Sequence, residues 1–266
     1  MATQVVEGAR VEIDLDAGCR LASFAVGGRE LLVTAGPGPI DWGCYPMAPY
    51  AGRVREGRFS FAGREYRLPR TLGGHAIHGS VYLRRWEAES DTSFVTELGP
   101  DWPFPGLARQ EVLLAPGGLA LRLEVHSGRG AMPASCGWHP WFRRQVAGAE
   151  AVLDFRPGFM FGRDAAGITT RALQPVTEGP WDDCFGGVEQ APAVTWPGVL
   201  QLELESNCDH WVVFTERAHA LCVEPQSAPP DALNHDPFVV EPGRPLVATC
   251  TIRWNPAQLP AGPAAG

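Results

Sequence analysis

Short stretches in which apolar and polar residues alternate recur along the whole sequence. Residues 11–16, 119–126, 200–205 and 246–254 all follow this pattern. A period of two places every second side chain on the same face of an extended chain, so each stretch predicts a β-strand with one buried face. Proline (25) and glycine (31) together exceed a fifth of the 266 residues, which argues against long helices. We therefore predict an all-β protein with only a few short helical turns.

Turn signals separate the predicted strands. Gly-Gly or Pro-Gly pairs occur at 27–28, 116–118, 157–158, 197–198 and 242–243. Many short antiparallel strands favour a large β-sandwich, and such folds commonly reach this length as one domain. Residues 1–254 are therefore predicted to form a single β-sandwich domain. The last segment, 255–266, contains little that can pack, and we expect it to fray.

The charge and cysteine content argue against several classes of protein. The formal net charge is −8, and no block rich in lysine or arginine offsets it, which argues against a nucleic-acid partner. No apolar run approaches the ~20 residues of a membrane-spanning helix, and the N-terminus lacks the pattern of a secretion signal. The seven cysteines are scattered, odd in number and without a CxxC pair, so they predict reduced thiols. The sequence thus favours a cytoplasmic protein without a membrane partner.

The stretch ALCVEPQSAPPDALNH (220–235) combines an apolar run with a carboxylate and three prolines. Glu224 precedes Pro225, and the residue before a proline is restricted to extended geometry. Because proline cannot extend a central ladder, we expect Glu224 to be the last residue of a buried strand, at the rim of the sheet. Partial burial would raise the pKa of its carboxyl and make it a stronger base. The alternative is a surface glutamate at a capped strand end.

Two further stretches carry candidate ligand-binding side chains. Arg53 precedes a predicted hairpin at 58–68, and it is either a surface residue or a guanidinium that binds ligand hydroxyls or a carboxylate. In GGHAIHG (73–79), His75 and His78 lie three residues apart. That spacing matches neither the HxH of a metal-binding barrel nor the helical HExxH, so it favours hydrogen bonding to a ligand over metal binding.

Two aromatic stretches complete the candidates. CGWHPWF (136–142) surrounds His139 with aromatic residues. His139 is either a satisfied core histidine or an acid–base group beside aromatic walls, and such walls also stack on sugar rings. In WDDCF (181–185), Asp182 and Asp183 are either turn residues or carboxylates that accept hydrogen bonds from ligand hydroxyls.

These stretches, in this order, resemble the aldose 1-epimerase (galactose mutarotase) family. LCVEPQ (221–226), followed by PDA (230–232) and Asn234, is similar to the C-terminal signature of that family. Four shorter matches are GRV (52–54), AIHG (76–79), WHPWF (138–142) and DDCF (182–185). Each is weak alone, but five in the right order, from about residue 49 to 234, are fairly specific.

The resemblance implies a galactose mutarotase-like supersandwich and a catalytic domain that interconverts the α and β anomers of an aldose without a cofactor or metal. It implies that Glu224 is the catalytic base and His139 the catalytic acid. His78 would assist at the ring oxygen of the sugar, and Arg53 and Asp182, in preference to Asp183, would bind hydroxyls. The matched stretches depart from the family pattern at Gly52, His75 and Pro140-Trp141. We also expect His75 and one or more of Trp138, Trp141 and Trp181 to contact the sugar.

Three alternatives remain open. A hexose-6-phosphate mutarotase would need a cationic pocket, for which the sequence offers Arg55, Arg58, Arg84, Arg85, Arg143 and Arg144. A sugar-binding β-sandwich would use Arg53, Asp182 and the tryptophans but no acid–base pair. A cupin-like metal enzyme would use His75, His78 and His139. A monomer and a homodimer both fit the sequence.

Overall fold

Strands account for nearly all the regular structure, as the alternation predicts. The computed structural model describes residues 1–255, which contain 27 strands and three 3₁₀ turns of three residues each. The turns are η1 (Arg55–Gly57), η2 (Val81–Leu83) and η3 (Ala232–Asn234). The prediction of an all-β protein with few short helical turns is confirmed. Within the same residues, no helix has the length and apolar character needed to cross a membrane.

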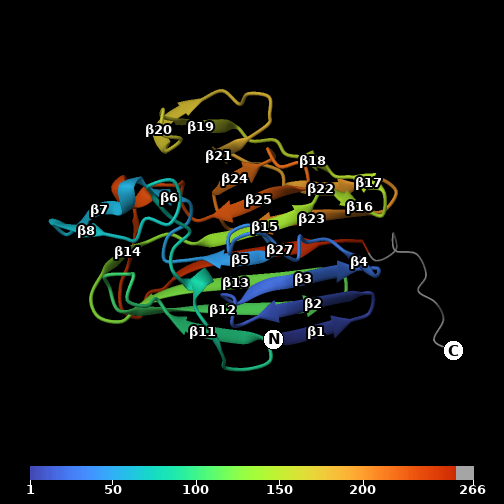
Figure 1. Ribbon diagram of the computed structural model, residues 1–266, viewed down its shortest axis with the longest axis horizontal. Coiled ribbons are helices and arrows are strands. Elements are labelled where there is room, and N and C mark those ends of the chain that lie inside the picture. Colours follow the sequence, from blue (N-terminus) through green and yellow to red (C-terminus); the bar gives the residue numbers. More distant parts are fainter. Residues whose placement is uncertain (256–266) are drawn as a thin grey trace.

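Two large antiparallel sheets form the sandwich (Figure 1). The 11-stranded sheet has the order β1 (Ala2–Val6), β2 (Ala9–Asp14), β3 (Arg20–Val26), β5 (Cys44–Met47), β15 (Gly137–Arg143), β25 (Ala220–Gln226), β24 (His210–Phe214), β21 (Asp182–Gly186), β19 (Phe159–Arg163) and β20 (Thr169–Gln174), with β4 (Arg29–Glu30) on β3. The eight-stranded sheet has the order β10 (Glu87–Ala88), β11 (Ser93–Glu97), β12 (Gly106–Ala115), β13 (Gly118–Ser127), β27 (Leu246–Arg253), β23 (Leu200–Ser206), β22 (Ala193–Trp196) and β18 (Val152–Asp154).

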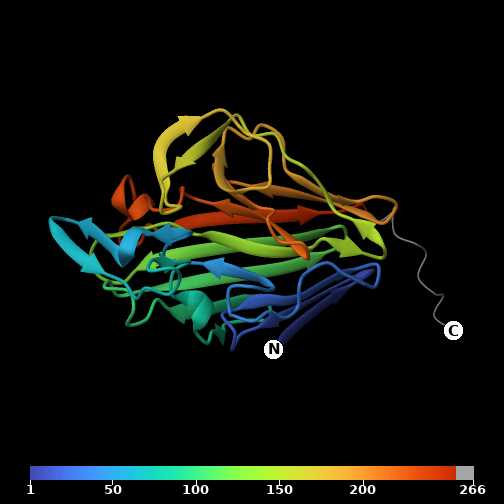
Figure 2. The same ribbon diagram turned by 45° about the horizontal axis from the view of Figure 1, so that its top comes forward.

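Four two-stranded pairs accompany the large sheets. They are β6 (Arg53–Val54) with β9 (Ala76–Ile77), β7 (Arg58–Phe61) with β8 (Arg64–Arg67), β14 (Met132–Ala134) with β26 (Phe238–Val240), and β16 (Gln145–Val146) with β17 (Ala149–Glu150). The β7–β8 hairpin lies where the sequence predicts a hairpin, and it projects from one end of the molecule (Figures 1 and 2).

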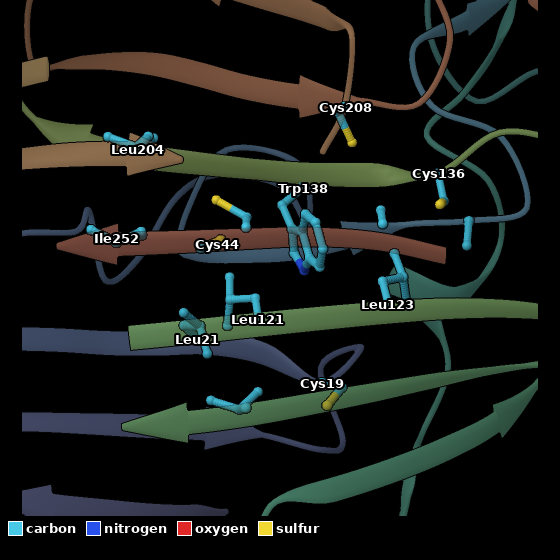
Figure 3. Close-up of a cluster of buried hydrophobic side chains, with 14 of the residues drawn as sticks. Cys19, Leu21, Cys44, Leu121, Leu123, Cys136, Trp138, Leu204, Cys208 and Ile252 are labelled. Carbon is cyan, nitrogen blue, oxygen red and sulfur yellow. The ribbon is translucent and has the colours of Figure 1, made fainter. Parts of the chain in front are cut away.

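The core lies between the two sheets and is built from alternate residues. In β13, Leu119, Leu121, Leu123 and Val125 are buried, whereas the residues between them are partly exposed. Trp138 of β15 lies among the side chains of Leu121 and Leu123 (Figure 3). The same core draws on residues from Ala9 to Trp254, which supports the proposal that residues 1–254 form one domain.

Part of the outer face of the 11-stranded sheet is buried as well. β25 is buried along its whole length. Leu221 and Val223 belong to the core between the sheets, whereas Cys222 packs with Trp141 in a separate small cluster. Because side chains alternate along a strand, Glu224 shares the outer face with Cys222. This outer face is where the candidate site forms.

Two further predictions concern the cysteines and the C-terminal segment. All seven cysteines are free and buried, and the reduced state of the thiols stays a prediction. The predicted frayed tail at 255–266 falls, apart from Asn255, outside the described residues.

Candidate active site

The central strands of the 11-stranded sheet bring five side chains into one row on its outer face. Cys184 of β21 pairs with Val212 of β24, and Val212 pairs in turn with Glu224 of β25. On the other side, His139 of β15 pairs with Tyr45 of β5. These strands come from distant parts of the sequence, so the row exists only once the sheet has formed.

His139 and Glu224 meet at the centre of this row. Gly137 pairs with Gln226 in the antiparallel ladder of β15 and β25, so two residues further along His139 lies opposite Glu224. The Nε2 atom of His139 is 3.2 Å from Oε1 of Glu224, and both side chains are buried. Gln226 donates a hydrogen bond from Nε2 to the other carboxyl oxygen of Glu224, at 3.1 Å.

The prediction that Glu224 ends its strand is wrong. β25 continues through Pro225 to Gln226, and Pro225 pairs with Trp211 of β24. A proline removes only its own N–H from a ladder, and the flanking residues of β25 hold the strand on both sides. A Cβ atom at Gly137 would lie 2.2 Å from the carbonyl oxygen of Pro225, so glycine at that position lets β15 approach closely.

Burial sets the protonation state of this pair. It raises the pKa of the Glu224 carboxyl well above 4.5, and the nearby negative charge of Asp182 adds to the effect. Burial lowers the pKa of His139 to about 3. Both shifts act in the same sense, because they favour a proton on Glu224 and a neutral imidazole at His139. The predicted rise in the pKa of Glu224 is confirmed in direction, although the side chain is buried completely rather than partly.

His78 lies beside this pair in a strained backbone conformation. Its φ is +60°, which is uncommon for a residue other than glycine. Its ring lies edge-on to the ring of His139, with centroids 5.1 Å apart. Nδ1 of His78 is buried and has no hydrogen-bond partner among the described residues. Burial lowers the pKa of His78, and the neighbouring His139 and Arg53 lower it further, so this imidazole is also neutral.

These side chains line a cavity of about 240 Å³. Six of the seven site residues predicted from the sequence line it: Arg53, His78, His139, Trp141, Asp182 and Glu224. Gln226, Arg163 and Asp183 line it as well. The predicted residues thus lie together, although up to 171 positions separate them in the sequence (53 to 224).

A group of paired charges forms one side of the cavity. Oδ2 of Asp182 lies 3.4 Å from Nη2 of Arg53 and 3.4 Å from Nη1 of Arg163. Nε of Arg163 also lies 2.9 Å from Oδ1 of Asp183. Arg163 therefore joins both aspartates, and the sequence reasoning missed it. Its only signal was a charged residue directly after the apolar run FMF and a glycine, which is too common to identify a site.

Of the three tryptophans considered, only Trp141 lines the cavity. Its ring is stacked on that of His139, with centroids 5.3 Å apart and planes 7° apart, and its Nε1 donates to the Ile40 carbonyl at 2.8 Å. Trp138 points to the opposite face of β15 and donates to Gln110 within the core (Figure 3). Trp181 packs against aromatic residues away from the cavity.

The structure separates His75 from the other predicted site residues. His75 is not among the residues that line the cavity. Its Nδ1 instead accepts a hydrogen bond from the backbone N–H of Glu56 at 3.0 Å, and its backbone closes a short turn with Leu72. The three histidines of the cupin-like alternative therefore do not converge.

The signature residues after Glu224 fix the segment that carries Arg53. The backbone N–H of Asp231 donates to the carbonyl of Arg53 at 2.7 Å, and the buried carboxylate of Asp231 accepts from the N–H of Arg55 at 2.8 Å. Asn234 donates to that same carboxylate at 2.8 Å. A Cβ atom on Gly52 would lie 2.6 Å from the ring of Pro230, so glycine at this position permits the tight contact between the two segments.

One group of described residues could hold a metal ion. The donor atoms of His139, Cys222 and Glu224 all lie within 4.8 Å of one another, and the three side chains are buried. Two of these side chains, His139 and Glu224, are also the pair in 3.2 Å contact.

A family model described as aldose 1-epimerase matches residues 7–253, nearly the whole chain. The chain belongs to the aldose 1-epimerase family. The predicted resemblance is therefore confirmed.

This aldose 1-epimerase family member is similar to individual proteins in sequence and in structure. It is 31% identical over 108 residues to YphB, an uncharacterised Escherichia coli K12 protein, and the match covers 38% of this chain and only 37% of YphB. It is 24% identical over 232 residues to YihR, an uncharacterised protein of the same strain, with 75% of each chain covered. Its structure matches a galactose mutarotase-like protein from Clostridium acetobutylicum with a TM-score of 0.81 at 14% identity, covering 95% of this chain and 94% of that one. At that identity the likeness establishes the fold alone.

Proposed function

We propose that this chain is a mutarotase, an isomerase that interconverts the α and β anomers of a free aldose. The observation that carries the proposal is the buried 3.2 Å contact between His139 and Glu224 in the wall of the cavity. Membership of the aldose 1-epimerase family supports the reaction class. The proposed substrate is a small sugar, which suits a cavity that combines an aromatic wall with paired charges.

The reaction needs one group that takes a proton and one group that gives a proton. A base removes the proton of the anomeric hydroxyl while an acid protonates the ring oxygen, and the ring opens. Rotation about the C1–C2 bond presents the other face of the carbonyl, and the same two groups then work in reverse to close the ring. A carboxyl and an imidazole that share one proton supply both functions, because one of them is always the acid and the other the base.

We assign Glu224 as the base at the anomeric hydroxyl and His139 as the acid at the ring oxygen. In the free protein the shared proton resides on Glu224, so sugar binding must transfer it across the 3.2 Å contact to His139. A sugar hydroxyl that donates to Glu224 favours this transfer, because hydrogen bonds to a carboxylate stabilise its ionised form. His78, whose Nδ1 has no hydrogen-bond partner among the described residues, lines the same cavity and would assist at the ring oxygen.

The remaining predicted residues hold the sugar. Arg53 and Asp182 present a guanidinium and a carboxylate that are only partly buried, so both can exchange their mutual contact for sugar hydroxyls. The indole of Trp141 offers an apolar face of the kind on which the C–H side of a sugar ring packs. Arg163, bound to both aspartates, fixes the orientation of Asp182.

The charges of the cavity favour an unphosphorylated substrate. Within residues 1–255, none of the six arginines considered for a phosphate pocket lines the cavity. The charged lining residues other than Glu224 are Arg53, Arg163, Arg217, Asp41, Asp182 and Asp183. Three carboxylates thus offset three guanidinium groups, and a phosphate dianion would find no net positive charge.

Polarimetry on freshly dissolved α-glucose, α-galactose and α-glucose 6-phosphate tests the proposal. We expect the protein to accelerate mutarotation of a free aldose more than that of the phosphate. A positioned acid or base contributes typically about 10²–10⁴-fold, so Glu224→Gln and His139→Asn should each lose two or more decades of rate. Glu203→Gln, on the exposed side of β23, is the matched control.

Two results would contradict the proposal. A wild-type rate of mutarotation in Glu224→Gln would show that Glu224 is not the base. Tight sugar binding without any acceleration of mutarotation would instead favour a sugar-binding protein that has no catalytic role.

A further inference from the structure

Arg20, at the start of β3, is a buried cation without a carboxylate partner. Arg20 is 1% exposed. No ion pair joins its guanidinium to a carboxylate in the described part of the chain. Arginine is almost never fully buried unless it is paired, because the loss of hydration is costly. A buried guanidinium of this kind therefore requires an explanation in the residues that it contacts.

The guanidinium of Arg20 is used to hold backbone. Nε donates to the carbonyl of Ala17 at 2.7 Å, Nη1 to that of Trp42 at 2.9 Å and Nη2 to that of Pro39 at 2.8 Å. Its central carbon also lies 4.1 Å from the ring centroid of Trp42 and 5.2 Å from that of Tyr45. Two of its three hydrogen bonds thus fix the two ends of residues 39–42.

Residues 39–42 form a wall of the cavity and support the rings around His139. Ile40 and Asp41 line the cavity. The Ile40 carbonyl accepts hydrogen bonds from Nε1 of Trp141 at 2.8 Å and from the hydroxyl of Tyr45 at 3.2 Å. The rings of Tyr45 and Trp141 are both stacked on His139, with centroids 5.0 and 5.3 Å from it. A continuous chain of contacts therefore leads from Arg20 to the imidazole.

The charge of Arg20 also acts on His139. The titratable and charged groups that face His139 from the elements packed around it are Tyr45, His78, Cys222, Glu224 and, behind Tyr45, Arg20. After burial, the positive charge of Arg20 lowers the pKa of His139. Arg20 keeps its charge in the interior, because a guanidinium does not lose its proton in proteins.

We propose that Arg20 is a positioning residue of this site. It holds residues 39–42 against Tyr45 and Trp141, and as a fixed positive charge it sets the pH range in which the His139–Glu224 pair carries one proton. The proposal rests on the proposed mutarotase function.

Two substitutions separate the two roles. Arg20→Met removes both the positive charge and the three hydrogen-bond donors. Arg20→Lys keeps the charge but lacks the planar guanidinium that reaches all three carbonyls. Removal of a positive charge favours every protonated form, so in Arg20→Met both the acidic and the alkaline limb of the kcat/KM profile should move to higher pH. An interaction across a protein interior predicts a movement of roughly half to one unit. In Arg20→Lys the limbs should stay, while kcat/KM falls roughly tenfold because the rings beside the reacting groups are misplaced.

A structural measurement makes the test independent of activity. Hydrogen exchange of the backbone amides of residues 36–43, followed by mass spectrometry, should be faster in both Arg20 variants. Arg143→Met is the matched control, because Arg143 also donates from Nε to a backbone carbonyl, that of Leu32 at 2.8 Å, but lies outside the cavity. It should change neither the limbs nor the exchange of residues 36–43.

The outcomes distinguish this inference from the proposed function. If the wild-type protein accelerates no aldose, the proposed function fails, and exchange still decides whether Arg20 holds residues 39–42. If the wild-type protein is active and Arg20→Met keeps its limbs and its exchange rates, the role of Arg20 is refuted. If Arg20→Met does not fold, Arg20→Gln, which is uncharged but keeps two N–H donors, replaces it in the same measurements.

Discussion

Replacement of Glu224 by glutamine should make the folded protein more stable at neutral pH while it removes activity. Burial raises the pKa of Glu224 well above 4.5, so folding withdraws an ionised carboxylate from water and gives it a proton. Its contribution to stability is fully present below pH 4.5 and is lost as the pH rises through the folded-state pKa. Between pH 4.5 and the folded-state pKa, unfolding releases one proton. The free energy of unfolding therefore falls by about 1.4 kcal/mol for each pH unit. Glutamine has nearly the same shape and does not ionise.

His139 acts in the opposite pH direction and must be separated from this effect. Burial lowers its pKa to about 3, so its contribution to stability is present above the unfolded value of 6.5 and is lost as the pH falls. Above pH 6.5 the imidazole is neutral in both states, and the difference between the wild type and Glu224→Gln then reports Glu224 alone.

Urea denaturation of both proteins between pH 4.5 and 8 measures the effect. The stability of Glu224→Gln relative to the wild type should grow by about 1.4 kcal/mol per pH unit and level off where the folded carboxyl ionises. Glu203→Gln, at an exposed position of β23, should show no such slope. A flat difference across the whole range would mean that Glu224 ionises as easily in the folded protein as in the unfolded chain, and the neutral state of the pair would be refuted.

Three substitutions test the support of the site. Gly137→Ala should destabilise the protein by about 1–3 kcal/mol in urea and lower kcat, because its Cβ would lie 2.2 Å from the carbonyl oxygen of Pro225; wild-type values would contradict the close approach of β15 and β25. Asp231→Ala should cost about 1–3 kcal/mol, because it leaves the N–H of Arg55 without its acceptor, and should raise KM; an unchanged KM would show that this contact does not position the sugar-binding segment. Arg163→Met should raise KM more than it lowers kcat in polarimetric assays, since it leaves Asp183 without its ion-pair partner and Asp182 with Arg53 alone. The reverse split would give Arg163 a role in the chemical step.

The sequence predicts strands and local motifs well because their signals are short in range. Alternation along 119–126 identifies β13 and its buried face, and the hairpin at 58–68 appears as β7 and β8. The order of strands around the site has no such signal. β5, β15, β25, β24 and β21 lie side by side although paired residues of neighbouring strands can be far apart in the sequence (Tyr45 and His139 are 94 positions apart). Only the match of several motifs indicates that these strands converge.

The errors and omissions have the same origin. The missing N–H of Pro225 predicts a strand end at Glu224, whereas the pairing of the neighbouring strands determines whether the ladder continues. Arg163 and Arg20 act through partners that are distant in sequence, and a single arginine after an apolar run resembles many surface residues. His75 shares a glycine-rich stretch with His78, yet of the two only His78 lines the cavity, and its backbone adopts the left-handed conformation there.

The two prolines beside the acid–base pair are part of how the sheet tolerates it. Pro140 follows His139 on β15, and Pro225 follows Glu224 on β25, so each strand lacks one N–H next to the pair. Here the strands are joined on either side of the pair, through Gly137 with its partner and again beyond Pro140, while the His139–Glu224 contact spans the interval between. The pair thus lies on central strands of the sheet. The contact between its side chains joins β15 and β25 at a point where the two prolines leave fewer backbone hydrogen bonds.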